Sequence, residues 1–308
     1  MGNIFGGGGG GDPPPPFAFY QCQGSTTDCC NGIDGLCDFG VNEIMFAMTH
    51  NAMSSREGGL PILFNHLYEL EGSLVTGFRG IGLDLCNCDG KYELCHGVCF
   101  IGSRSLKNGF GNILQFLNDN PTEVILVTLQ LDGNAGGPIS LDDFYQALRL
   151  EVPELLDMMY AHAQGTAWPT LGELKSTGKR IILFHYNGPN DCSNGQCPPG
   201  LHFWWDYAAE TPFSFDSIDD LLDIDKSCSI TRGAGSTMDF FGVNAFTTPP
   251  SQSDAEFINS ESLLQTRIDD CSTAQMQDVN VVSVDFWSVG ELPKVVQERN
   301  TALVARSS

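Results

Sequence analysis

Seven short apolar runs rich in Val, Ile, Leu and Phe recur along this chain, and helical patterns separate most of them. The runs span residues 42–50, 80–85, 123–131, 180–185, 202–207, 240–246 and 279–286. Runs of this composition are typical of parallel strands that are buried on both faces. Their alternation with helices over about 270 residues predicts an α/β fold, either a (β/α)8-type barrel or a doubly wound sheet.

The chain divides into three segments by composition. Residues 1–17, MGNIFGGGGGGDPPPPF, form a Gly/Pro-rich tail that predicts a flexible linker and lacks the apolar core of a signal peptide. Residues 18–40 form a Cys-rich lead-in, which we expect to pack as a disulfide-stapled cap. Residues 41–308 carry the alternation of strands and helices, and a length of this order suits one large domain.

The charge balance limits the partners of this protein. The chain has 15 Lys and Arg against 38 Asp and Glu, a net charge of −23. Such a chain repels nucleic acid and anionic membrane surfaces, so a basic patch would not hold it on lipid. No run of about 20 apolar residues is present, and the sequence therefore predicts no transmembrane segment.

Cysteine usage indicates an oxidising compartment. The chain has 12 cysteines, several of them closely spaced, which predicts disulfides and an extracellular or secretory location. The alternative is a zinc site built from Cys86, Cys88, Cys95 and Cys99, with His96 nearby. Zinc usually takes a CxxC-type knuckle, and the CxC spacing here disfavours that alternative. The spacing does not determine which cysteines pair.

Polar side chains gather where the predicted strands end. In a barrel, alternate strand residues point inward, and the chemistry lies at the carboxyl ends of the strands. This parity, together with the residues that follow the strand ends, gathers one polar set on the rim: His50, Asn51, Asp84, His96, Gln130, Asp132 and Asp285. A single histidine at a strand end is more often a structural hydrogen-bonding group. Two histidines and an aspartate together indicate acid–base catalysis, because the aspartate orients one imidazole as a base and the second histidine supplies the acid.

Five stretches together resemble the phosphatidylinositol-specific phospholipase C-like phosphodiesterases, most closely the plant-type X-domain-containing proteins. They are NEIMFAMTHNAMS, GFRGIGLDLCNCDGKYELCHG, FLNDNPTEVILVTLQ, GKRIILF and VNVVSVDFW, and the Cys-rich lead-in is also similar. The resemblance covers roughly residues 20–300. It implies a distorted TIM (β/α)8 barrel with a small N-terminal Cys-rich segment, and the hydrolysis of a phosphoric diester.

The resemblance also implies roles for three residues. His50 matches the general base that deprotonates an inositol 2-hydroxyl, which then attacks the neighbouring phosphorus. His96 matches the general acid that protonates the leaving alcohol, and Asp285 matches, by its place at a strand end, the carboxylate that orients His50. The product would be a cyclic phosphate that water later opens.

The sequence departs from this family where the phosphate is bound. Phosphoryl chemistry needs positive charge on the non-bridging oxygens. Bacterial members place an arginine where this chain has Cys86, and calcium-dependent members place glutamates where it has Gly82 and Gln130.

A weak Ca²⁺ site remains open as a cofactor prediction, because Ca²⁺ takes oxygen ligands. Its candidate ligands are Asn51, Asp84, Gln130 and Asp132.

Several other side chains are candidates for contact with the substrate. Asn51, Asp84 and His185 are the predicted substrate or phosphate ligands. Parity turns Arg79 away from the rim and predicts a structural role for it.

Three further cations could approach a phosphate, or equally form surface or structural ion pairs: Arg180, Lys226 and Arg232. The aromatic stretch WWDYAAETPF, residues 204–213, could contact a sugar-like ring or lipid, and core packing explains it equally well.

Two other functions stay open at this point. A catalytically impaired barrel could bind a phosphorylated ligand, because the arginine and the glutamates are missing. A metal-dependent enzyme near the glycerophosphodiesterases or sphingomyelinase D is the second, although Gly82 stands where those enzymes keep an acid. The expected partner is a phosphoinositide or another phosphodiester, with transient contact to a membrane surface.

Overall fold

A curled, mostly parallel sheet forms the centre of the protein in this computed structural model, which describes residues 22, 27–60, 62–132, 139–187, 197–233 and 238–307. Eleven strands make up the sheet, and its main path runs β11-β10-β12-β13-β3-β4-β7-β8-β9. In chain order these strands are β3 (Phe46–Thr49), β4 (Gly80–Cys88), β7 (Ile125–Asp132), β8 (Ile181–His185), β9 (Leu201–Phe203), β10 (Ala208–Glu210), β11 (Arg232–Gly233), β12 (Phe240–Ala245) and β13 (Val281–Val284).

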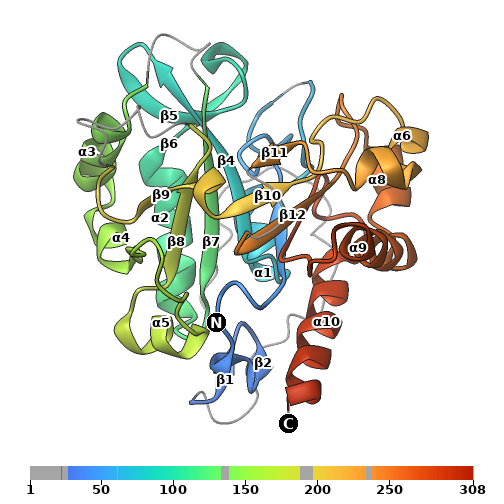
Figure 1. The fold of residues 1–308 in the computed structure, drawn as a ribbon. Coiled ribbons are helices and arrows are strands. Elements are labelled where there is room, and N and C mark those ends of the chain that lie inside the picture. The colour runs from blue at the N-terminus through green and yellow to red at the C-terminus, as the bar shows by residue number, and fades with distance from the viewer. Residues whose placement is uncertain are drawn as a thin grey trace.

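Every neighbouring pair along this path is parallel except β10 with β11. The path ends at β9 and β11, which are not neighbours in the described sheet, so the sheet curls as a half-barrel that does not close (Figure 1). Two strands, β5 (Lys91–Cys95) and β6 (Ser103–Ser105), extend β4 as an antiparallel ribbon. The predicted distorted barrel is confirmed, and the doubly wound sheet is excluded.

Helices cover the outside of the sheet in two groups (Figure 1). The described α-helices are α1 (Leu70–Val75), α2 (Leu106–Asp119), α3 (Leu141–Glu151), α4 (Pro153–Met158), α5 (Leu171–Thr177), α6 (Ile218–Leu222), α7 (Ile224–Ser227), α8 (Gln252–Ile258), α9 (Glu261–Gln275) and α10 (Leu292–Ser307). Helices α2 to α5 lie beside β7 and β8, whereas α9 lies beside β12 and α10 packs against α9 and β3. Pro153 ends α3 and begins α4, as expected for a residue that cannot donate a helical hydrogen bond.

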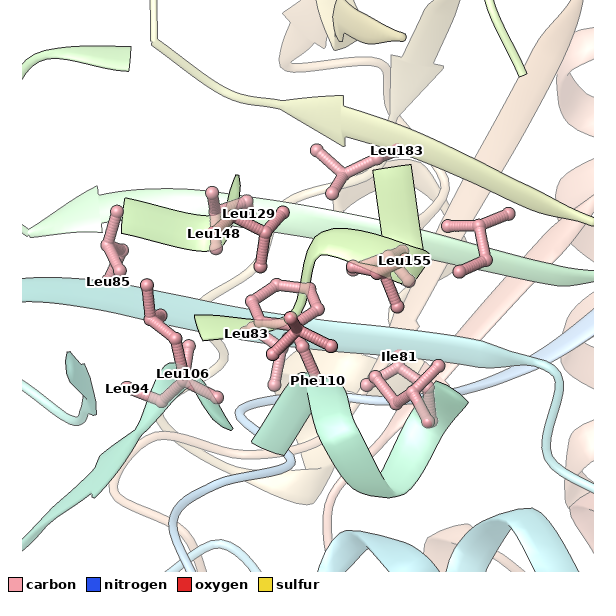
Figure 2. Packing of buried hydrophobic residues seen from close by; sticks show 14 of the residues in the cluster. Ile81, Leu83, Leu85, Leu94, Leu106, Phe110, Leu129, Leu148, Leu155 and Leu183 are labelled. Atoms are coloured by element: carbon pink, nitrogen blue, oxygen red, sulfur yellow. The ribbon is translucent and has the colours of Figure 1, made fainter. Parts of the chain in front are cut away.

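Strand parity divides the buried side chains into two layers. Ile81 and Leu83 of β4, with Leu129 of β7, pack outward against Phe110 of α2 and Leu148 of α3 (Figure 2). Residues of the opposite parity fill the interior of the curled sheet: Phe46, Met48, Leu126, Ile182, Phe184 and Phe240. This inner layer forms the floor beneath the carboxyl ends of the strands, where the candidate site lies.

A disulfide-stapled cap covers the opposite end of the sheet. Strands β1 (Cys29–Cys30) and β2 (Ile33–Asp34) pair antiparallel. Asn31 exchanges hydrogen bonds with the backbone of Val124, one residue before β7 begins. Disulfides join Cys22 to Cys29 and Cys30 to Cys37. The division into residues 1–17, 18–40 and 41–308 stays a prediction, and the tail of residues 1–17 lies outside the described residues.

Five disulfides are described, and the prediction of disulfide bonding is confirmed. Besides the two in the cap, they join Cys86 to Cys95, Cys88 to Cys99, and Cys228 to Cys271. The zinc alternative is wrong, because its four cysteines are paired with one another as two disulfides. Among the helices in the described residues, none combines the length and the apolar character needed to cross a membrane.

Candidate active site

A histidine–aspartate pair lies at the carboxyl ends of two neighbouring strands. His50 comes one residue after β3, and Asp285 comes one residue after β13. These strands are parallel, with Thr49 opposite Val284, so the register sets the two side chains beside each other. Nδ1 of His50 lies 2.9 Å from Oδ1 of Asp285. When the Nδ1–H donates to this carboxylate, Nε2 carries the lone pair and can accept a proton.

Three further contacts fix this pair. The amide of Asn65 donates to the same Asp285 oxygen at 2.9 Å, and the amide of Asn259 donates to the Asp285 carbonyl at 2.9 Å. The ring of Phe246 stacks on His50 with centroids 3.9 Å apart and an interplanar angle of 6°. The side chain of Asp285 is 4% exposed and that of His50 is 30% exposed. The imidazole is therefore held in place and still accessible to a ligand.

The backbone takes an uncommon conformation next to both residues. Asn51 has φ of 50°, and Phe286 also has φ of 50°. The left-handed region is costly for residues other than glycine, and such residues often lie at functional sites. The chain turns sharply directly after each member of the pair, which places both side chains at the ends of their strands.

A second, buried histidine supports the first. Nε2 of His66 lies 2.6 Å from the carbonyl oxygen of His50, and the Trp287 N–H donates to its Nδ1 at 3.3 Å. These partners place the proton of a neutral His66 on Nε2. Burial lowers the pKa of His66 to about 4, against the effect of the Asp285 charge, and nearby His50 and His96 also lower it. Both candidate catalytic histidines thus lie within electrostatic range of His66.

His96 is held at the end of the antiparallel ribbon. It directly follows β5, and its Nδ1 lies 3.3 Å from Oγ of Ser54, which belongs to the loop after β3. The neighbouring Cys95 is bonded to Cys86 of β4, and Cys88 is bonded to Cys99. These two disulfides tie the short segment around His96 to the strand that carries Asp84.

A pocket opens beside His50, with an empty volume of about 430 Å³ that includes space open to solvent. Asp84 and Gln130 line it, as strand parity predicted, and so does Asn51, which follows His50. Its lining also includes residues that the sequence did not assign to the site: Tyr186, Asn244 and Phe246. The side chain of Asp132 lies outside the described residues. In the register of β4 and β7, Asp132 stands opposite Cys86.

His185 is a correction to the predicted site. Its neighbour Phe184 faces the interior of the sheet, so His185 shares the outward face with Leu183. His185 is fully buried, its ring packs near Phe203, and burial lowers its pKa to about 4. It is absent from the lining of the pocket. The sequence placed His185 on the rim by its position alone, and strand parity turns it away.

The predicted structural role of Arg79 is confirmed. This residue is buried, its Nε donates to Glu123 at 2.6 Å, and its Nη1 donates to the carbonyl oxygens of Leu74 and Phe78.

The other three cations differ in position. Arg180 donates to three backbone carbonyls, including that of Glu123, and Lys226 forms an exposed pair with Asp220. Arg232 lines the pocket.

The aromatic stretch of residues 204–213 is divided between two environments. Trp204 is fully buried in the inner layer of the sheet, so core packing explains it. Phe213 is 52% exposed and lines the pocket, where it is available to a ligand.

The described residues fit Ca²⁺ poorly. Ca²⁺ takes six or more oxygen ligands, with carboxylates dominant, and Asp84 is the one carboxylate among the described side chains that line the pocket. A β-carbon at Gly82 would lie 2.9 Å from the Thr49 carbonyl oxygen, so a carboxylate cannot be added there without a backbone shift. Arg232 brings a positive charge to the same pocket.

Any hydrolytic activity of this pocket is therefore expected to survive chelation. Turnover measured in excess EGTA should equal turnover measured with added CaCl₂, because the described lining offers a divalent ion one carboxylate. Loss of turnover in EGTA, with recovery on adding Ca²⁺ but not Mg²⁺, would contradict this expectation.

Gly82 also gives a test of the packing under the site. Gly82→Ala is expected to lower the free energy of unfolding by about 1–3 kcal/mol, as in other overpacked cores, because the new methyl group meets the strand end that carries His50. The matched control is Gly111→Ala on α2, where a β-carbon meets nothing within 4 Å. This control should stabilise the protein by about 0.5–1 kcal/mol. Equal thermal midpoints for the two variants would refute the close approach at Gly82.

Comparison with solved structures first shows which known proteins share the fold of this chain. Phosphatidylinositol-specific phospholipase C from Listeria monocytogenes is 16% identical, with a TM-score of 0.58 over 91% of this chain and 98% of that chain. A structure of the Staphylococcus aureus enzyme is 13% identical, with a TM-score of 0.60 over 88% of this chain and 97% of that chain. At this identity the similarity establishes the shared fold.

Sequence comparison gives the family. The family model described as PI-PLC X 1 matches residues 36–300, and the chain belongs to this family. A PI-PLC X domain-containing protein 1 from Arthroderma benhamiae is 28% identical over 289 residues, 88% of this chain and 89% of that protein. An uncharacterised secreted protein from the same fungus is 26% identical over 197 residues, 62% of this chain and 42% of that protein.

Proposed function

We propose that this protein hydrolyses a phosphatidylinositol-like phosphodiester by acid–base catalysis between two histidines. The observation that carries the proposal is the His50–Asp285 pair, with 2.9 Å between Nδ1 and Oδ1, beside a pocket that His50 lines. The family is that of PI-PLC X domains, and the fold is that of phosphatidylinositol-specific phospholipases C.

In the first step, Nε2 of His50 takes the proton from the hydroxyl next to the phosphoester. The oxygen then attacks phosphorus and closes a cyclic phosphate. Asp285 holds Nδ1–H and stabilises the imidazolium that forms, as a carboxylate does for a catalytic histidine. Asn65 holds the carboxylate in turn, and Phe246 keeps the ring in its plane.

The leaving alkoxide needs a proton, and we assign its donation to His96, which resembles the family's general acid. The Ser54 hydroxyl lies 3.3 Å from Nδ1 of His96, and in this proposal Nε2 is the atom that donates the proton. In the second step the roles reverse: His96 activates water against the cyclic phosphate, and His50 returns its proton to the ring oxygen. Asn51 and Asp84 line the pocket and would contact the polar part of the substrate.

The protein is proposed to act outside the cytosol. Five described disulfides support an oxidising compartment, and a similar fungal protein is described as secreted. Contact with a membrane surface would be transient.

The experiment that tests the function uses phosphatidylcholine vesicles that contain phosphatidylinositol. The expected result is release of inositol phosphate into the aqueous phase while diacylglycerol stays in the lipid. Vesicles of phosphatidylcholine alone serve as the control and should release nothing. Absence of release from both vesicles, or phosphate that stays attached to the lipid, would contradict the proposal and favour a binding-only barrel or a different bond.

A further inference from the structure

The pocket beside His50 has to stabilise negative charge in a strongly acidic protein. The net charge of the chain is −23, and Asp84 adds a carboxylate to the pocket itself. A phosphodiester is an anion, and negative charge on its non-bridging oxygens must be balanced during transfer. Among the described residues that line this pocket, Arg232 is the one with a permanent positive charge.

Arg232 is held on the pocket wall by an edge of the sheet. It lies on β11 directly opposite Glu210 of β10, and its Nη2 donates to the Glu210 carboxylate. Three aromatic rings surround the guanidinium, with its carbon 4.3 Å from the ring centroid of Phe213, 5.2 Å from that of Trp205 and 5.7 Å from that of Tyr186. Such stacking fixes the plane of an arginine while leaving its edge free to donate.

Glu210 is satisfied by more than this arginine. It is 4% exposed, and it accepts hydrogen bonds from Trp204 Nε1 at 2.5 Å, the Tyr186 hydroxyl at 3.2 Å and Asn244 Nδ2 at 3.3 Å. Burial and the nearby Glu210 raise the pKa of the Tyr186 hydroxyl, which therefore stays a donor. Because three other groups donate hydrogen bonds to the Glu210 carboxylate, it does not need every N–H group of the Arg232 guanidinium.

Arg232 keeps donors for a ligand. A guanidinium has five N–H groups, and the salt bridge uses Nη2. Its Nε is buried and has no hydrogen-bond partner among the described residues. Because Nε is closed to solvent, the donors offered to a ligand are those on the exposed part of the side chain. The side chain of Arg232 is 26% exposed, so a ligand in the pocket can reach it.

We propose that Arg232 contacts the non-bridging phosphoryl oxygens of the substrate and stabilises the charge that develops on them, an inference that rests on the proposed function. Glu210 and the aromatic rings orient the guanidinium before the substrate arrives. No rearrangement is then needed when the oxygen attacks phosphorus. The contact is to the phosphate, and the hydroxyl groups of the substrate are left to Asn51 and Asp84.

The test compares Arg232→Ala, Arg232→Lys and a matched surface control, Arg299→Ala, whose guanidinium pairs with Asp269 away from the pocket. Arg232→Ala is expected to lower kcat about 10²–10³-fold, as does loss of one preorganised donor elsewhere, and to raise KM by a smaller factor, because the same contact also holds the phosphate before it reacts. Guanidinium chloride at a non-denaturing concentration should restore part of the activity. Arg232→Lys should be intermediate, and Arg299→Ala should match the unaltered protein.

A double variant separates the effect of the lost positive charge on turnover from an effect on folding. Arg232→Met combined with Glu210→Gln removes both charges of the pair, so the buried carboxylate is not left unpaired. This double variant should fold and show the same loss of kcat. A lowered thermal midpoint in Arg232→Ala, with no guanidinium rescue and normal kcat in the double variant, would overturn the proposal and assign Arg232 a structural role.

Binding of inorganic phosphate, followed by phosphorus NMR line width, distinguishes this inference from the proposed function. Phosphate should bind the unaltered protein and not Arg232→Ala. Binding of myo-inositol, which contains no phosphorus and is followed by proton NMR line width instead, should be the same in both proteins. Phosphate binding that depends on Arg232, without turnover of any phosphodiester, would support the contact and contradict the function. Normal kcat in Arg232→Ala, a change in KM alone, or phosphate binding that is absent or independent of Arg232 would overturn the contact.

Discussion

Replacing His50 with alanine is expected to lower kcat by about 10³-fold or more, which is within the range found for general acid–base residues. Without the imidazole, the proposed acceptor for the proton of the attacking hydroxyl is lost. KM should change little, because the imidazole acts on the reacting proton. The measurement is steady-state turnover of phosphatidylinositol, with circular dichroism to show that the variant folds.

Two variants sharpen this result. Asp285→Asn keeps the shape of the side chain and removes the charge that orients His50, so it should also lose most of the turnover. His162→Ala is the matched histidine control, since that ring stacks on Trp168 outside the pocket. Full turnover in a folded His50→Ala would contradict the role of His50, and equal losses in His50→Ala and His162→Ala would point to general destabilisation.

His96→Ala is expected to show a loss that depends on the leaving group. With diacylglycerol as the leaving group, turnover should fall about 10²–10⁴-fold, because the alkoxide then leaves without a proton. With p-nitrophenol as the leaving group the loss should be small, since this phenolate leaves without protonation. The measurement is the ratio of kcat for a lipid and a p-nitrophenyl ester of inositol phosphate, in the unaltered protein and in His96→Ala.

His50→Ala supplies the control for this comparison. A general base is needed whatever the leaving group, so His50→Ala should lose turnover on both substrates. If His96→Ala lost the same factor on both esters, His96 would be needed for attack or for folding, and its assignment as the acid would fail.

Much of the fold was predictable because strands buried on both faces leave a strong signal in the sequence. The run at 123–131 became β7, and the run at 180–185 became β8. The short strands β9 and β10 flank a single 3-10 turn. The sequence predicted one strand over 202–207, where the chain turns at Trp204. A run of aromatic residues does not reveal such a turn, because the same side chains suit a strand and a packed corner.

Part of the candidate site was likewise predictable from the sequence, and part was not. Strand parity predicted that His50 and Asp84 share one face, since adjacent parallel strands keep their side chains in register. The parity rule also applies to His185, which it sends outward. His66 and Asn65 lie in a loop without a periodic pattern, and only the folded chain brings them under His50 and Asp285. Glu210 and Arg232 meet through an antiparallel pairing between residues 22 positions apart, which a single sequence does not reveal.

The proposed mechanism depends on one event, the attack of a neighbouring hydroxyl on phosphorus after His50 removes its proton. Phosphorus NMR of phosphatidylinositol during turnover tests this event most directly. We expect the signal of a five-membered cyclic phosphate early in the reaction, later replaced by that of an acyclic monoester, and neither signal with His50→Ala. An acyclic monoester that forms from the start, with solvent oxygen on phosphorus and no cyclic signal at any time, would contradict the proposed mechanism.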